Sequence, residues 1–163
     1  LVLLKIRQNK RKRGLIMNIM RVRWIVLVIG IALLWVASEK GEMRNASIAF
    51  GIGAAGGFLL DAIGTKFRFW VYLRQPFLSS KYFLIVLPAW GVFGMAVNLA
   101  WDWWGVTPWL ALTIITIGLF ILHEIPNLKV KSWEYNVPLW FVFLSWVPLV
   151  GSFRILFLLF RGY

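Results

Sequence analysis

The sequence predicts an all-α integral membrane protein, a polytopic bundle of about five transmembrane helices. Three observations predict this class. Of the 163 residues, 61% are hydrophobic and only 15% are charged, whereas soluble domains usually carry about 25% charged residues. The apolar residues gather in five runs, and tryptophan and tyrosine crowd the breaks between them, as they do at membrane–water interfaces. Too few polar side chains remain to cover a water-soluble globule, so the expected solvent is lipid.

Each apolar run comes near the roughly 20 residues that a helix needs to cross about 30 Å of hydrocarbon. The second break, "LRQPFLSSK", combines proline, serine and cations, and the third, "WDWWGVTP", combines glycine, proline and aromatic rings. In the last run, Pro148, Gly151 and Arg154 predict a kink or an interruption. The expected spans are residues 22–38, 46–63, 82–100, 107–123 and 137–160.

The distribution of lysine and arginine predicts a cytoplasmic N-terminus in the plasma membrane, because cytoplasmic loops carry an excess of these residues. Eight of the 18 cations precede Trp24. The second and fourth breaks hold six more, against two in the first break and none in the third. The stretch "MNIMRVRW" at 17–24 resembles a natural start. We therefore interpret residues 1–16 as a basic N-terminal extension and residues 17–163 as one transmembrane domain.

The net charge of +12 does not predict nucleic-acid binding, because the cations flank the apolar runs. Without cysteine the chain has no disulfide, thiolate metal site or nucleophilic thiol, and a single histidine does not make a metal site. We expect neither a metal nor another cofactor. The expected partners are membrane lipid and a second copy or another subunit.

Two polar breaks share a pattern at an offset of 63 residues. Each has an acid, a lysine five residues later, a cation at +7, tryptophan at +9 and tyrosine at +11. Each copy follows one expected span and precedes the next, with two spans between the copies. The pattern therefore predicts a parallel internal repeat about an axis along the membrane normal. The matched pairs are Asp61 with Glu124, Lys66 with Lys129, Arg68 with Lys131, Trp70 with Trp133 and Tyr72 with Tyr135.

Small residues form a row on the second span. Ala49, Gly53 and Gly57 recur every four residues and lead to Asp61, so all four share one helix face. Small residues at this spacing let another helix approach closely. The row predicts a helix-packing seam, with Asp61 facing protein at its end.

Asp61 and Glu124 are the candidate catalytic residues, because a carboxylate at bilayer depth is costly and marks a functional site by default. The alternative is that each acid, at the end of a span, pairs with the lysine five residues further on or caps a turn. Asn98, about one turn inside the membrane, is interpreted as a packing residue or as a ligand contact. Asp102 is expected to be an exposed residue of the aromatic belt.

Two segments resemble known proteins. "DAIGTKFRFWVY" and "WEYNVPLWFVFLSW" are similar to interfacial segments of the small multi-span membrane proteins of carotenoid biosynthesis. These are the lycopene cyclase domain of the heterodimeric or fused type and the related carotenoid hydratase family. The resemblance covers about residues 50–150. The cyclase pattern also has paired acids after a proline-containing turn, where this sequence reads "LPAW" at residues 87–90.

The resemblance implies acid chemistry on a polyene. A carboxylic acid in an apolar site adds a proton to a C=C bond, and aromatic faces stabilise the carbocation. Asp61 and Glu124 would be the acids, and no redox cofactor would be needed. The partner that the resemblance implies is an apolar isoprenoid ligand. The residues implied to bind it as substrate are Trp70, Tyr72, Asn98, Trp133 and Tyr135.

Two other functions stay open. The first is a non-enzymatic multi-span protein that packs with a partner subunit through the face of Gly53 and Gly57. The second is a small transporter or its subunit, which the scarcity of polar residues at mid-membrane depth disfavours.

Overall fold

The computed structural model describes residues 24–73, 77–80, 82–105, 107–129 and 133–162. The proposed extension, residues 1–16, and Lys131 of the repeat lie outside these ranges. A helix lies over each of the five expected spans. They are the first helix Trp24–Glu39, α2 (Met43–Lys66), α3 (Leu87–Trp104), α4 (Pro108–Leu119) and α6 (Leu139–Arg161). Short elements connect them: η1 (Tyr82–Val86), η2 (Phe120–Glu124), α5 (Ile125–Lys129) and the strands β1 (Trp70–Tyr72) and β2 (Trp133–Tyr135).

Among the described residues, three helices are long and apolar enough to cross a membrane. These are Met43–Lys66, Tyr82–Trp103 and Leu139–Arg161. The first helix and Pro108–Gly118 are apolar but shorter. The mostly helical class is therefore confirmed, and these three helices have the length and apolar composition expected of a membrane protein. Of the kink or interruption expected in the last run, the interruption does not occur, because α6 continues through Pro148, Gly151 and Arg154.

Proline and glycine set the ends of the helices. Pro108 begins α4, where the missing N–H group leaves no hydrogen bond unmade, and Pro88 lies in the first turn of α3 directly after η1. Gly105 follows α3 with a φ of 60°, the left-handed conformation that ends many helices. The first half of the third break therefore belongs to α3, which ends at Trp104, four residues before α4 begins.

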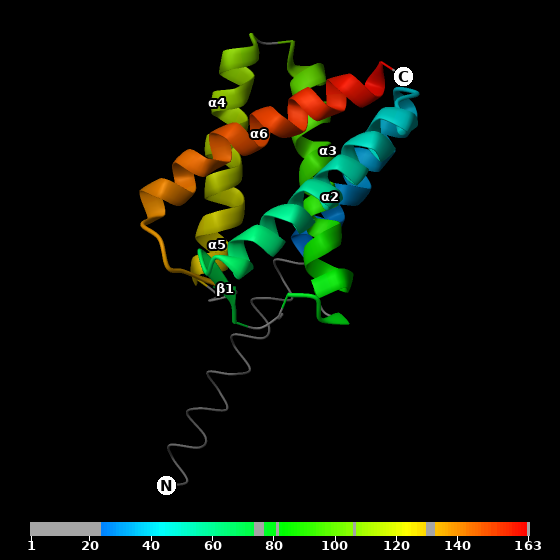
Figure 1. Ribbon diagram of the computed structural model, residues 1–163. Coiled ribbons are helices and arrows are strands. Elements are labelled where there is room, and N and C mark those ends of the chain that lie inside the picture. The colour runs from blue at the N-terminus through cyan, green and yellow to red at the C-terminus, as the bar shows by residue number, and fades with distance from the viewer. Residues whose placement is uncertain (1–23, 74–76, 81, 106, 130–132, 163) are drawn as a thin grey trace, which may run out of the picture.

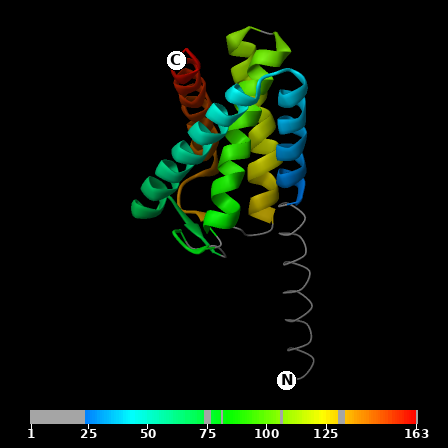
Figure 2. The same cartoon turned by 90° about the vertical axis from the view of Figure 1, so that its right-hand side faces the viewer.

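The helices form two sets that cross each other. In Figure 1, α3 and α4 stand upright, and α2 and α6 run diagonally across them. Figure 2 shows the first helix on the side of α3 and α4 that lies away from α6. Buried side chains of α3, α4 and α6, among them Phe93, Ile115 and Trp146, make one apolar cluster. The strands lie at the lower end of the view in Figure 1, and the C-terminus lies at the opposite end.

The small-residue row of α2 packs against α3. A Cβ atom on Gly53 would lie 2.7 Å from the Gly94 Cα atom and would also meet the Trp90 carbonyl oxygen. A Cβ atom on Gly57 would overlap the Trp90 ring. Ala49 is fully buried in the same row. A partner subunit that used this face would have to displace α3.

The two strands are an addition to the expected all-α class. β1 and β2 pair antiparallel, with Trp70 opposite Tyr135 and Tyr72 opposite Trp133. The Asn136 N–H group donates to the Phe69 carbonyl oxygen at 2.9 Å and extends this pairing. The two-stranded ribbon therefore joins the breaks in which the sequence pattern repeats.

Candidate functional site

Asp61 is a fully buried carboxylate in the last two turns of α2. Its Oδ1 atom accepts a hydrogen bond from the Tyr72 hydroxyl at 2.6 Å. Its Oδ2 atom accepts from the Tyr82 hydroxyl at 2.8 Å and from the Trp90 indole N–H at 2.9 Å. The three donors come from β1, η1 and α3. The hydrogen bonds of Asp61 therefore connect β1, η1 and α3 to the C-terminal end of α2.

Glu124 occupies the corresponding place at the end of η2. Its side chain is buried, and its Oε2 atom accepts a hydrogen bond from the Tyr135 hydroxyl at 2.7 Å. In each half of the pattern an acid therefore binds the tyrosine eleven residues further along the chain. The acid lies at the end of a helical segment, and the tyrosine lies on the ribbon.

Four aromatic residues of the ribbon form two similar pairs. The Trp70 and Tyr135 rings have their centroids 6.2 Å apart at 73°, and the Tyr72 and Trp133 rings have theirs 5.9 Å apart at 79°. Gly64 makes room for Trp70, because a Cβ atom there would overlap its indole ring. Edge-to-face packing of this kind is favourable for aromatic rings.

Both acids and all four ribbon aromatics line one pocket with a volume of about 510 Å³. The other described walls are mostly apolar and come mainly from the first helix, α2, η1, α3 and α6. Trp90 stacks on Trp146 inside this lining, with ring centroids 6.0 Å apart and an interplanar angle of 28°. A cavity of a few hundred Å³ with apolar walls and a few convergent polar groups is typical of ligand sites. We call it the acid–aromatic pocket.

Burial and the adjacent acids raise the pKa values of the ribbon tyrosines. The pKa of Tyr72 lies well above its usual value, because burial and then the Asp61 charge disfavour the phenolate. The pKa of Tyr135 is also raised, by burial and then by Glu124. Both hydroxyls therefore remain protonated hydrogen-bond donors at neutral pH.

Most residues expected at the site lie together, but Asn98 does not. The pocket brings together Asp61, Trp70, Tyr72, Glu124, Trp133 and Tyr135. Asn98 is fully buried within α3, and its amide donates to the Gly94 carbonyl oxygen at 2.9 Å. It is not among the described residues that line the pocket. The alternative partner of Asp61, Lys66, has its ammonium 5.9 Å from the Phe67 ring centroid.

Two of the donors to Asp61 could not be predicted from the repeated pattern. Tyr82 and Trp90 follow Asp61 by 21 and 29 residues, and neither belongs to the repeated pattern. The available signal was the position of Trp90 one residue after "LPA", inside a span and away from the interface belt. A tryptophan at such a depth needs a hydrogen-bond acceptor for its indole N–H group.

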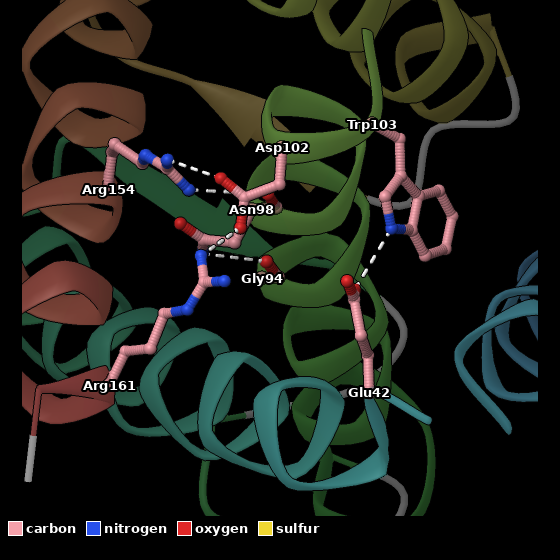
Figure 3. Close-up of polar contacts among 7 residues, drawn as sticks. All are labelled: Glu42, Gly94, Asn98, Asp102, Trp103, Arg154 and Arg161. Atoms are coloured by element: carbon pink, nitrogen blue, oxygen red, sulfur yellow. Dashed lines mark hydrogen bonds and ion pairs between the residues drawn. The ribbon is translucent and has the colours of Figure 1, made fainter. Parts of the chain in front are cut away.

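The expectation for Asp102 was wrong, because its side chain is only 16% exposed and is ion-paired. Arg154 reaches its Oδ1 atom at 2.5 Å, and Arg161 reaches its Oδ2 atom at 2.6 Å. Figure 3 shows both arginines converging on Asp102, next to Asn98. We call these three residues the arginine cluster. It joins the ends of α3 and α6 that lie away from the ribbon.

Comparison of the chain with protein-family models, with curated proteins and with solved structures finds no match. The geometry of the pocket is therefore the basis for a functional proposal.

Proposed function

We propose that this membrane protein binds an isoprenoid-like lipid in the acid–aromatic pocket and acts on it by carboxylic-acid chemistry. The observation that carries the proposal is that Asp61 and Glu124 line the same apolar, aromatic pocket. An apolar cavity fits a hydrocarbon chain, and its acids lie where a double bond of that chain would pass. The resemblance of two segments to proteins of carotenoid biosynthesis agrees with this substrate class.

In the proposed chemistry, one carboxylic acid transfers its proton to a carbon of a C=C bond. The neighbouring carbon becomes a cation, which faces the π-systems of Trp70 and Trp133. The second carboxylate then removes a proton from an adjacent carbon, so that the double bond moves or a ring closes. No oxidant or reductant is consumed. The pair of acids supplies both proton transfers.

The proposal includes five membrane crossings with a cytoplasmic N-terminus in the plasma membrane. Three helices have spanning length, and the helical chain of α4 and η2 from Pro108 to Glu124 is about 25 Å long. That length is close to the thickness of the hydrocarbon layer. The pocket end of α2 carries Lys66 and Arg68, which agrees with a cytoplasmic position for the pocket.

The internal repeat is also part of the proposal, and the strand register supports it. In the repeat, Trp70 matches Trp133 and Tyr135 matches Tyr72. Replacing each residue of the cross-strand pair Trp70–Tyr135 by its match gives Trp133–Tyr72, which is the other cross-strand pair of the ribbon. The two acid–tyrosine hydrogen bonds, at 2.6 and 2.7 Å, are exchanged in the same way. A local two-fold axis passing between Val71 and Glu134, which are opposite each other in the ribbon, would produce both exchanges. We infer that a duplicated segment built the two halves of one pocket.

Expression in polyene-producing cells tests the proposed function. The extracted polyenes, separated by chromatography, should shift to an isomerised or cyclised product when the protein is present. Asp61→Asn and Glu124→Gln should each abolish the shift while the protein still accumulates in the membrane. Glu134→Gln is the matched control, because Glu134 is exposed on the same ribbon and does not line the pocket. Unchanged polyenes with the native protein, or full activity of both acid variants, would refute the proposal.

A further inference from the structure

Asp61 is a buried carboxylate that forms no ion pair with any lysine or arginine among the described residues. Its side chain has no solvent exposure, and its three donors, Tyr72, Tyr82 and Trp90, are neutral. Among the residues the structure describes, the ion pairs join Asp102 to Arg154 and Arg161. Burying a carboxylate is costly unless a proton or a positive charge compensates it. That compensation has to come from outside the described side chains.

The walls around Asp61 are suited to an organic cation. Within the described part of the chain, the lining contains a second acid and several tryptophan and tyrosine rings but no lysine or arginine. Aromatic faces attract ammonium groups, and recognition of quaternary ammonium ions commonly uses such rings. The other lining is apolar, which disfavours a small hydrated ion and favours a bulky apolar body.

The pocket is also reachable from the lipid-facing surface. Leu27 of the first helix and Leu84 of η1 line the pocket, and they are 49% and 77% exposed. In a membrane, surface of this kind faces acyl chains. A ligand dissolved in the bilayer would therefore meet this apolar edge of the pocket first.

We propose that the acid–aromatic pocket binds lipophilic organic cations, with the positive group held by Asp61 and the aromatic walls. This rests on the proposed function in using the same pocket, but it requires no turnover. A stable ammonium or phosphonium ion would use the same electrostatics that the proposed chemistry uses for a carbocation. The volume of about 510 Å³ suits a drug-sized ligand.

Binding of radiolabelled tetraphenylphosphonium to the purified full chain in lipid nanodiscs tests the inference. The native protein should bind the ion saturably, and unlabelled triphenylphosphine oxide, which is neutral, should displace it poorly. Asp61→Asn should weaken binding about tenfold or more, because the fixed negative charge is lost. Glu134→Gln removes a carboxylate of the same ribbon outside the pocket and should bind like the native protein.

A second variant keeps the test decisive if Asp61→Asn does not fold. Trp70→Leu keeps an apolar wall but removes a π face, and it should weaken binding about fivefold. Native-like affinity in folded Asp61→Asn or Trp70→Leu protein, or equal displacement by the neutral oxide, would overturn the inference. Saturable binding without any polyene product would refute the proposed function alone. Polyene conversion without phosphonium binding would refute this inference alone.

Discussion

Asp61 and Asp102 are acids at opposite ends of the bundle, and the protein satisfies them in different ways. Asp61, at the ribbon end, accepts hydrogen bonds from one tryptophan and two tyrosines. Asp102, at the other end, is held by Arg154 and Arg161. The first acid keeps an uncompensated charge or takes up a proton, whereas the second has its charge balanced within the chain.

The difference indicates a ligand-binding role for Asp61 and a structural role for Asp102. Arg154 also lies 5.3 Å from the Trp101 ring centroid and hydrogen-bonds the Asn98 carbonyl oxygen at 3.4 Å. The Arg154 guanidinium is therefore already paired with Asp102. Arginines in or near membrane-spanning segments are usually paired in this way. The neutral donors of Asp61 orient the carboxylate and leave its charge available to a proton or a ligand. We therefore expect function at the ribbon end and stability at the other.

The largest expected effect tests this assignment directly. Asp102→Asn leaves the mostly buried Arg154 guanidinium without its ion pair and should lower the free energy of unfolding by about 3 kcal/mol. Asp61→Asn removes a buried charge and keeps one of the two acceptor oxygens, so its cost should be smaller, about 1 kcal/mol, from the donor that loses its acceptor. Unfolding of both variants by sodium dodecyl sulfate in mixed micelles, followed by circular dichroism, measures the difference. Equal losses at the two acids would abolish the distinction between the two ends.

Much of the helical arrangement could be predicted from the sequence, because apolar runs and their breaks are local signals. The five expected spans all coincide with helices, and the row of Ala49, Gly53 and Gly57 lies on the face against α3. The strands could not be predicted, since "WVY" and "WEY" are too short to read as strands alone. They pair only because the fold brings the two breaks together.

The polar partners were harder to predict because they are distant in sequence. Asp102 and Arg154 are 52 residues apart, and Asp102 was taken for a belt residue. A charged residue inside a span, such as Arg154, indicates that an acid must lie at the same depth, and Asp102 was available there. The repeat identified the two acids and the two tyrosines as matched positions. It did not predict that each acid accepts a hydrogen bond from the tyrosine of its own copy.

A second prediction concerns the packing of α2 against Trp90 at the ribbon end. Gly57→Leu drives a side chain into the Trp90 ring, which is also a donor to Asp61, and should destabilise the protein by about 1–3 kcal/mol. Gly51→Leu is the matched control on the same helix, because a Cβ atom there meets nothing within 4 Å. The detergent unfolding assay compares the two variants. Because Trp90 is displaced, phosphonium binding should also weaken in Gly57→Leu. Equal stability of the two leucine variants would contradict close packing of α2 against α3 at Gly57.

The smallest expected effect is a loss of folding stability at alkaline pH that comes from the two ribbon tyrosines. The pKa values of Tyr72 and Tyr135 are raised in the folded protein by burial and by the neighbouring acids. In the unfolded chain both hydroxyls ionise near pH 10, their usual value. The folded state therefore holds more protons above pH 10. The stability from these groups is fully present below pH 10 and is lost as the pH rises towards the folded-state pKa values.

Each tyrosine should thus lower the free energy of unfolding by up to about 1.4 kcal/mol per pH unit above pH 10. A double variant, Tyr72→Phe and Tyr135→Phe, should show a correspondingly flatter decline between pH 10 and pH 11 in the detergent unfolding assay. Tyr82 is kept in both proteins, so its contribution cancels in the comparison. The arginine cluster adds nothing to the decline, because guanidinium groups stay charged at these pH values. The same slope in the native protein and the double variant would mean that the ribbon hydroxyls are not held as buried donors to the acids.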